Sequence, residues 1–192
     1  MIRRDSLLSL EAYARERNAF RARVIEHKKH RTVHLGAHVT LLFEDELTIR
    51  YQVQEMLRIE RIFEEEGIQH ELDAYNPLVP DGGNWKATML IEYPDADERR
   101  RMLARLKGIE RRVWVRVQGE APVHAIADED LERENEEKTS SVHFLRFELS
   151  GAMRERLKSG AALAIGVDHP HYSFEADPVP PQTRAALAQD LR

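Results

Sequence analysis

Four of the nine histidines fall close together in the sequence, at His27, His30, His34 and His38. Neutral imidazole is the commonest metal ligand in proteins, so this spacing suggests a site for a divalent ion such as iron, zinc or manganese, with His34 and His38 as candidate ligands. Lysines and an arginine are interleaved with the cluster, and cations beside a metal are unfavourable. The stretch therefore also fits a solvated basic helix end or an anion site.

A second polar cluster, Asp168-His169-Pro170-His171-Tyr172, directly follows a predicted strand. Loops at strand ends often carry functional residues because a rigid element positions the side chains. Carboxylate and imidazole together can bind a metal or move a proton. Asp168 and His169 are therefore candidate catalytic residues, and His169 and His171 are candidate metal ligands. The alternative is a turn around Pro170 whose polar residues are incidental.

Glu60 falls in an apolar stripe when residues 48–63 are placed on a helix. A buried carboxylate is costly unless it is paired or neutralised, so Glu60 is part of a structural ion pair or is a metal ligand or general base. The remaining alternative is that the helix boundary is misjudged. Arg17 takes a similar position on the preceding helix, and we predict an Arg17–Glu60 ion pair. Four residues on the less apolar side of residues 48–63 are candidates for ligand binding: Arg50, Tyr51, Glu55 and Arg58.

His143 alternates with Leu145 and Phe147, and a period of two places all three on one apolar face of a strand. It is a candidate ligand-binding residue, and the alternative is a core histidine whose hydrogen bonds are satisfied. Ser140 and Ser141 precede it, but no GxSxG nucleophile elbow surrounds them. The chain also lacks a Gly-rich phosphate loop of the Walker A or GxGxxG type, which disfavours nucleotide binding of those kinds.

The composition excludes several classes of site and partner. Of the 192 residues, 42% are apolar and 33% are charged, as in a globular domain. The lack of cysteine excludes disulfides, thiolate metal sites, iron–sulfur ligation and thiol nucleophiles. A formal net charge of −5 gives no general support for binding to nucleic acid or an anionic membrane. No signal-peptide core or stretch of roughly 20 apolar residues is present, so we expect a cytoplasmic protein.

The elements that position these residues can be read from apolar periodicity and from capping and turn residues, such as Ser9 before the first helix and Gly36 between two strands. The predicted helices span residues 9–31, 48–63, 96–107, 150–158 and 181–191. The predicted strands span residues 33–35, 39–43, 87–93, 113–117, 123–127, 142–149 and 162–167. Residues 71–83 are predicted to form a loop.

These elements predict an α+β fold, with one mixed, largely antiparallel sheet and helices packed on it. Two strand–helix–strand segments, 87–117 and 142–167, would add two βαβ units in the C-terminal part. We expect a single domain over 1–192. Its expected parts are an N-terminal helical part at about 1–80, a sheet-rich part at about 84–175 and a tail helix at about 181–191.

Six short stretches form an ordered set along nearly the whole chain: Arg31-Thr-Val-His-Leu-Gly36, His38-Val-Thr-Leu-Leu-Phe-Glu44, Arg50-Tyr-Gln-Val-Gln-Glu-Met-Leu-Arg58, Asp73-Ala-Tyr-Asn-Pro77, Ser141-Val-His-Phe-Leu-Arg-Phe147 and Val167-Asp-His-Pro170. Together they resemble a bacterial family of unknown function. That family has no established activity, so the resemblance implies no catalytic roles. Its genes often lie beside a rubrerythrin and an iron–sulfur oxidoreductase. The resemblance therefore implies a redox or peroxide-stress context, with a rubrerythrin or an iron–sulfur oxidoreductase as a possible partner.

Three functions follow from these observations. The first is an accessory protein that binds a metal or small ligand in a redox or peroxide-stress pathway. The second is a metal-assisted hydrolase or an oxygen-dependent enzyme, in which Glu60, or Asp168 with His169, moves protons. The third is a protein–protein interaction module that uses the highly charged segment 128–138, which we expect to be a solvated helix or a lid.

Overall fold

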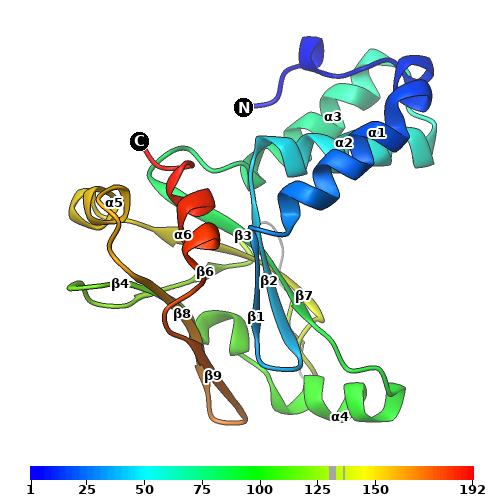
Figure 1. The fold of residues 1–192 in the computed structure, drawn as a ribbon. Helices are drawn as coiled ribbons and strands as arrows, with labels where there is room; N and C mark the ends of the chain where they lie inside the picture. Colours follow the sequence, from blue (N-terminus) through cyan, green and yellow to red (C-terminus); the bar gives the residue numbers. More distant parts are fainter. Residues whose placement is uncertain (130–132, 136) are drawn as a thin grey trace. The chain divides into compact units, whose positions relative to one another are not determined.

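The chain forms two compact units in the computed structural model, which describes residues 1–129, 133–135 and 137–192 (Figure 1). The helical unit comprises Met1–His30 and Glu44–Pro80, and the sheet unit comprises Arg31–Phe43 and Asp81–Arg192. The predicted helical part, residues 1–80, is thus interrupted by a hairpin that belongs to the sheet unit. The single domain expected from the sequence stays a prediction.

The helical unit contains α1 (Leu10–Lys28), α2 (Glu46–Glu60), α3 (Glu65–Tyr75) and two short 3₁₀ helices, η1 (Arg4–Ser6) and η2 (Asn76–Leu78). Ser9 caps α1 by accepting a hydrogen bond from the backbone N–H of Ala12, which confirms the predicted start of this helix. Asp45 and Thr48 form a reciprocal capping box at the start of α2. Helix α3 was not expected, and its second half was predicted to be a loop.

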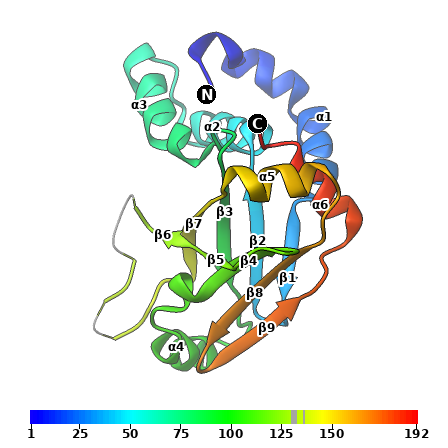
Figure 2. The ribbon, with the colours of Figure 1, turned by 90° about the vertical axis from the view of Figure 1, so that its left-hand side faces the viewer.

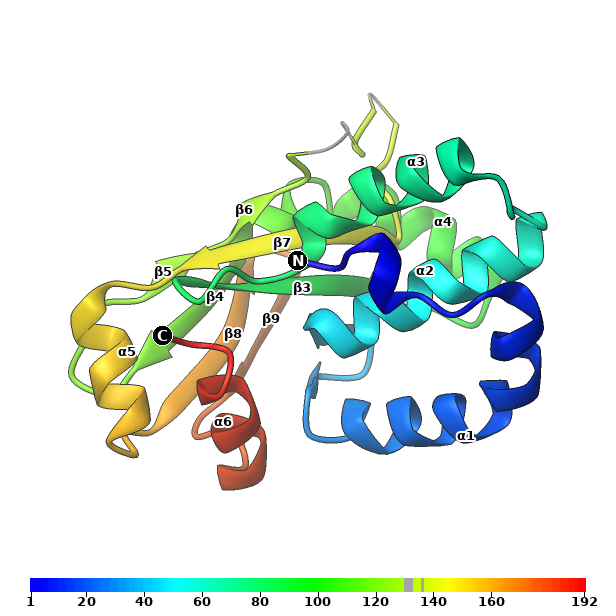
Figure 3. The same cartoon turned by 90° about the horizontal axis from the view of Figure 1, so that it is seen from above.

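The core of the helical unit forms around α2, which contacts α1 on one side and α3 on the other (Figure 3). Ile49, Val53 and Leu57 recur along α2 at helical spacing and are buried. They pack with apolar residues of the N-terminal segment and α3: Ile2, Leu7, Ile68 and Leu72. Burial of this stripe explains why residues 46–60 form a helix.

The sheet unit contains two antiparallel sheets. The strands of the first, in spatial order, are β1 (Thr32–Leu35), β2 (Val39–Glu44), β3 (Asn84–Ile91), β7 (Val142–Glu148) and β6 (Ile126–Ala127). The strands of the second are β5 (Val123–His124), β4 (Val113–Val117), β8 (Leu163–His169) and β9 (Tyr172–Ala176). The α+β class and the antiparallel pairing predicted from the sequence are confirmed, but the strands form two sheets where one was expected.

The two predicted βαβ units are wrong. The strands that flank α4 (Ala96–Arg105) are β3 and β4, which belong to different sheets, and the same holds for β7 and β8 around α5 (Gly151–Lys158). Strand β3 instead pairs with β7, and β4 with β8, both antiparallel. Each strand–helix–strand segment therefore crosses from the first sheet to the second, and neither encloses a parallel pair.

One apolar core contains buried side chains from both sheets, among them Phe43, Trp85 and Phe147 from the first and Val115 and Ile165 from the second. The alternating burial of β3 and β7 agrees with one face of each strand pointing into this core. Helices α5 and α6 (Pro181–Ala188) lie at one end of the strands and α4 lies at the other, while η3 (Ile109–Arg112) leads into β4 (Figure 2).

Two further expectations concern the charged segment 128–138 and membranes. Residues 130–132 and 136 of that segment lie outside the described residues. Among its described residues, Glu134 forms an isolated antiparallel bridge with Thr139. Within the described part of the chain, no helix is both long and apolar enough to cross a membrane.

Candidate functional site

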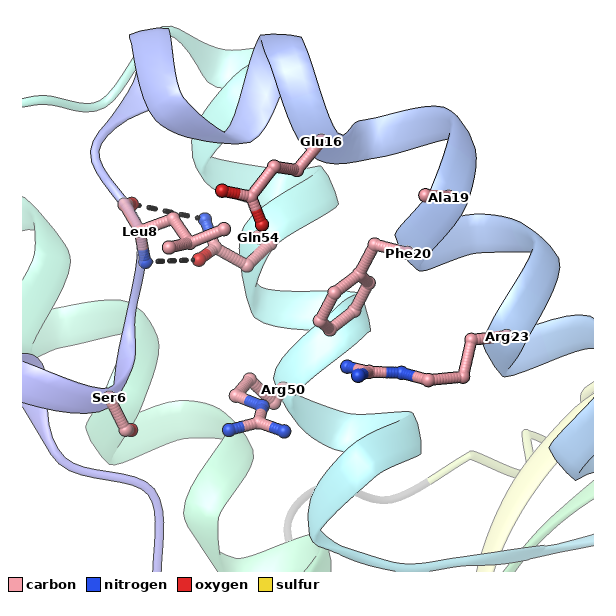
Figure 4. Close-up of a pocket in the computed structure, with 8 residues that line it drawn as sticks. All are labelled: Ser6, Leu8, Glu16, Ala19, Phe20, Arg23, Arg50 and Gln54. Carbon is pink, nitrogen blue, oxygen red and sulfur yellow. Dashed lines mark hydrogen bonds between the residues drawn. The ribbon is translucent and has the colours of Figure 1, made fainter.

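A pocket of about 510 Å³ opens between α1, α2 and the N-terminal segment of the helical unit (Figure 4). It is lined by Ser6, Leu8, Glu16, Ala19, Phe20, Arg23, Arg50 and Gln54. This volume lies in the range of pockets that bind small molecules. Only Arg50 of these residues was singled out from the sequence. The lining residues of α1 recur at spacings of three and four residues, which was the signal that they share one helix face.

Two guanidinium groups lie beside the ring of Phe20. The Cζ atom of Arg23 is 4.8 Å from the centre of the ring, and that of Arg50 is 5.9 Å from it. The Nε atom of Arg50 is shielded from solvent and has no hydrogen-bond partner among the residues that the structure describes. Within the described residues, neither guanidinium has a carboxylate at ion-pair distance. The two positive charges therefore lie beside the face of an aromatic ring and not in an ion pair.

Aromatic contacts fix Phe20 in place. Its ring stacks on Tyr51 of α2, with 6.0 Å between the ring centres and 18° between the planes. Tyr13, which lies about two turns earlier on α1, packs edge-on against it, with 6.0 Å between the ring centres. Such pairs contribute about 0.5–1.5 kcal/mol beyond burial, so Phe20 forms a rigid wall of the pocket. Tyr51, a predicted ligand-binding residue, thus packs against the ring of Phe20 and is not among the residues that line the pocket.

Gln54 holds the N-terminal segment against α2. Its side-chain Oε1 accepts a hydrogen bond of 2.7 Å from the backbone N–H of Leu8, and its Nε2 donates one of 3.4 Å to the Leu8 carbonyl (Figure 4). In Figure 4 the Glu16 carboxylate lies on the Gln54 side of the pocket, and the two guanidinium groups lie on the other side of Phe20. The pocket therefore has a cationic end and an acidic end.

Glu55, another predicted ligand-binding residue, is engaged inside the helical unit. Its carboxylate accepts hydrogen bonds from the Tyr13 hydroxyl at 2.7 Å and from Nη2 of Arg58 at 3.2 Å, besides two from Arg17. The hydrogen bonds from Arg17 are the main reason that the pKa of Glu55 falls to about 2. Arg58, which is exposed, pairs with Glu55 and does not line the pocket.

The predicted Arg17–Glu60 ion pair is wrong, because Arg17 binds Glu55 instead and Glu60 is exposed. Helical spacing does place Glu60 in line with Val53 and Leu57, but α2 ends at Glu60, and Arg61 follows in the left-handed conformation. The last buried residue of α2 is Leu57, one turn before Glu60. The structure thus gives no buried setting for Glu60 as a metal ligand or general base.

The four clustered histidines do not form one site. His27 lies 2.5 Å from the Asp45 carboxylate in the helical unit, and His30 is exposed. His34 and His38 lie in the sheet unit, where both line a groove of about 760 Å³. Arg31, which was expected to be solvated or to bind an anion, is buried and bound to Asp190. The basic stretch therefore divides between the two units.

The second predicted cluster forms the turn between β8 and β9. His169 is buried, and both of its ring nitrogens are engaged: Nε2 donates to the Lys107 carbonyl at 3.0 Å, and Nδ1 accepts from the backbone N–H of His171 at 3.1 Å. Asp168 is half exposed, with its carboxylate 3.8 Å from His124. His171 is exposed. This geometry leaves His169 no free ring atom for a metal or a proton transfer.

His143 is fully buried and hydrogen-bonded on both sides of its ring. Its Nδ1 lies 2.5 Å from the Asp128 carboxylate, and its Nε2 lies 3.0 Å from both the Thr139 hydroxyl and the Ser140 carbonyl. This is the arrangement of a core histidine whose hydrogen bonds are satisfied. Its ring has no exposed face and does not line the pocket around Phe20, and ligand binding by His143 stays a prediction.

Metal ligands do not converge in the described parts of the chain, where no group of three or more His, Cys, Asp or Glu side chains is placed to hold a metal ion. The predicted ligands form two pairs within the sheet unit, His34 with His38 and His169 with His171. A metal site on these residues stays a prediction, and only the first pair retains free ring nitrogens on both members.

Comparisons with other proteins give a family and one close relative of known structure. A family model described as a protein of unknown function (DUF3501) matches residues 1–191. A crystal structure of a protein of unknown function from Burkholderia pseudomallei K96243 is similar over 100% of this chain and 99% of that one, with 63% sequence identity and a TM-score of 0.95. Among curated proteins, none matches the chain.

Proposed function

The chain belongs to the DUF3501 family of proteins of unknown function, and from its pocket we propose that it is an accessory protein that binds a small anionic ligand. The ligand would be a molecule that carries a carboxylate or a phosphate group. The single observation that supports this proposal most strongly is the placement of Arg23 and Arg50 beside Phe20 without a carboxylate partner among the described residues.

Two guanidinium groups around one ring repel each other, and the repulsion is relieved when an anion lies between them. Guanidinium is planar and donates hydrogen bonds in a fork that matches carboxylate and phosphate oxygens. The shielded Nε of Arg50 adds a second argument. An unpaired buried donor costs about 1–3 kcal/mol, and a bound oxyanion would satisfy it.

The neighbouring groups favour a small ligand with both polar and apolar parts. The pocket volume of about 510 Å³ accommodates a metabolite. Phe20 and Leu8 supply apolar surface, while the Ser6 hydroxyl and the two guanidinium groups supply donors. Because Gln54 fixes the N-terminal segment through two hydrogen bonds, this wall of the pocket is preformed and requires little ordering on binding.

Isothermal titration of the purified protein with inorganic phosphate, succinate, citrate and adenosine monophosphate tests this proposal. We expect saturable binding of at least one anion at one site. Arg50→Gln and Arg23→Gln should each weaken that binding about tenfold, because a charge-assisted hydrogen bond is lost. Arg58→Gln is the matched control: Arg58 lies on the same helix outside the pocket, and its loss should leave affinity unchanged.

Two outcomes would overturn the proposal. One is that none of the four anions binds. The other is that Arg58→Gln weakens binding as much as Arg50→Gln does, since affinity would then follow net charge and not the pocket. Thermal unfolding of each variant without ligand shows whether a weakened variant is still folded.

The redox or peroxide-stress context belongs to the same proposal, with a rubrerythrin or an iron–sulfur oxidoreductase as the partner. Its support is the sequence resemblance alone. The chain has no cysteine, so it would take part in electron transfer only through a bound cofactor or by serving the partner without redox work. Sedimentation of the purified chain with each candidate partner, with and without the bound anion, measures this association. If neither partner binds under either condition, this part of the proposal fails.

A further inference from the structure

We propose that the groove at the end of the β1–β2 hairpin binds a divalent transition metal through Nε2 of His34 and Nε2 of His38. The groove lies in the sheet unit and has a volume of about 760 Å³. No residue of the anion pocket lines it, so the two proposals are independent.

The β1–β2 hairpin carries both histidines: His34 lies on β1, and His38 lies in the turn just before β2. His34 on β1 lies opposite Thr40 on β2, and His38 precedes Thr40 by two residues. Leu35 and Val39, which alternate with them, are buried in the core. Both side chains line the same groove, together with Thr40 and Glu92.

The ring of His38 has a defined tautomer. Its Nδ1 lies 2.9 Å from the backbone carbonyl oxygen of Glu92. A carbonyl oxygen only accepts, so Nδ1 carries the proton and Nε2 of the neutral ring carries a free lone pair. The ring also stacks on Tyr93, with 3.9 Å between the ring centres and 12° between the planes. Its orientation is therefore fixed before any metal binds.

The ring of His34 has the same tautomer for a different reason. The Thr40 hydroxyl donates its only hydrogen to the Glu92 carboxylate at 2.9 Å. The Thr40 oxygen, 3.1 Å from Nδ1 of His34, must therefore accept from that nitrogen. Nε2 of the neutral His34 ring is left with a free lone pair. Both histidines thus meet the usual requirement of metal ligands, in which the second ring nitrogen donates to a fixed acceptor.

Glu92 joins the two halves of this arrangement, because its backbone carbonyl orients His38 and its carboxylate orients His34 through Thr40. The other predicted ligand pair, His169 and His171, does not leave a ring nitrogen free on both members, since His169 uses both of its ring nitrogens in hydrogen bonds. Two imidazole ligands suit zinc, copper, nickel or iron. Because no third His, Asp or Glu side chain among the described residues completes the set, the remaining positions would be taken by water or a small molecule.

The first test is a calorimetric titration of untagged, chelator-treated protein with Zn²⁺ alone. We expect one site per chain. His34→Gln and His38→Gln should each weaken binding at least tenfold. Thr40→Val, which removes the acceptor that orients His34, should weaken it by about tenfold or more while the ligands remain. His30→Gln is the matched control, because His30 is exposed and is not among the residues that line the groove.

A second measurement needs no metal. Long-range ¹H–¹⁵N spectra of the imidazoles should show both rings protonated at Nδ1, and addition of Zn²⁺ should shift Nε2 of both. The proposal is overturned if Zn²⁺ binds equally well to His34→Gln and His38→Gln, if His30→Gln loses binding to the same extent, or if either ring proves to be protonated at Nε2. Unfolding temperatures of the variants distinguish loss of the site from loss of the fold.

Discussion

The guanidinium of Arg17 on α1 binds both carboxylate oxygens of Glu55 on α2, with Nε at 2.7 Å from Oε1 and Nη2 at 2.8 Å from Oε2. The Glu55 side chain is 13% exposed, so the pair is largely sheltered from solvent. Tyr13 donates to the same carboxylate, and burial together with this bond raises the pKa of the Tyr13 hydroxyl above its ordinary value. These contacts connect the two helices that line the pocket around Phe20.

We predict that Glu55→Gln lowers the free energy of unfolding by about 1.5–3 kcal/mol at neutral pH, because the charge-assisted hydrogen bonds from Arg17 are lost. The pKa of Glu55 is about 2 in the folded protein, against an ordinary value of 4.5 for a solvated glutamate. A depressed pKa contributes stability that is full above about 4.5 and is lost as the pH falls toward about 2. Urea unfolding from pH 7 to pH 2.5 measures this difference.

The wild type and Glu55→Gln should therefore converge in stability as the pH falls through this window. A gap that stays constant from pH 7 to pH 2.5 would show that Glu55 acts through packing alone. Glu46→Gln is a suitable control, since Glu46 is exposed on the first turn of the same helix.

The β1–β2 hairpin shows what local patterns can predict. Apolar alternation and a central Gly36 were sufficient to place both strands within one residue of their bounds. Gly36 adopts a φ of +73°, and a Cβ atom there would lie 2.6 Å from the Tyr172 hydroxyl. The identity of Tyr172 as the neighbour depends on the position of β9, a strand that was not predicted.

Tertiary pairing explains what could not be predicted. Glu60 was placed on a buried face because periodicity gives the direction of a side chain but not where the covering partner ends. The strands around α4 and α5 were recognised, but their assignment to two sheets depends on the β3–β7 and β4–β8 pairings between distant segments. Arg50 was selected as a candidate, whereas its neighbour Phe20 was not, because spacing alone does not reveal a pocket.

Asp190 near the C-terminus holds the buried Arg31 of the sheet unit. Both guanidinium Nη atoms of Arg31 reach the Asp190 carboxylate, and its Nε donates to the Phe43 carbonyl at 2.9 Å. Asp190→Ala would remove both of these charge-assisted hydrogen bonds from a buried guanidinium, so we predict a loss of about 3–5 kcal/mol in the free energy of unfolding. Urea unfolding of the variant at pH 7 measures it.

Asp97→Ala provides the comparison for Asp190→Ala, because Asp97 forms an exposed pair with Arg100 on α4. Its removal should change stability by less than about 0.5 kcal/mol. Equal effects of the two substitutions would mean that burial of Arg31 does not depend on Asp190.

His143 is predicted to stabilise the sheet unit through its buried hydrogen bonds. His143→Leu introduces an apolar side chain of similar size, and it leaves the Asp128 carboxylate and the Thr139 hydroxyl without this partner. We expect a loss of about 2–3 kcal/mol, measured by urea unfolding. His171→Leu, at an exposed histidine, should stay within about 0.5 kcal/mol of the wild type. A stable His143→Leu variant would contradict the structural role and restore His143 as a candidate for function.

Of the described residues that line the pocket around Phe20, Glu16 is the only acidic one, and its charge would oppose an anion bound at Arg23 and Arg50. Glu16→Gln removes that charge with little change in shape. The interaction of charges near a protein surface is worth about 0.2–1 kcal/mol, so we expect the affinity for the anion to rise by up to about fivefold.

If Glu16 acts through its charge, the effect of Glu16→Gln on affinity should also depend on salt. Its gain in affinity should shrink as the salt concentration rises, because exposed charges are screened over roughly 10 Å at 0.1 M salt. Calorimetric titrations at low and high salt measure both effects. Glu11→Gln is the control, since Glu11 lies on the same helix but does not line the pocket. Tighter binding in both variants would trace the effect to net charge, whereas unchanged binding in Glu16→Gln would place the anion away from Glu16.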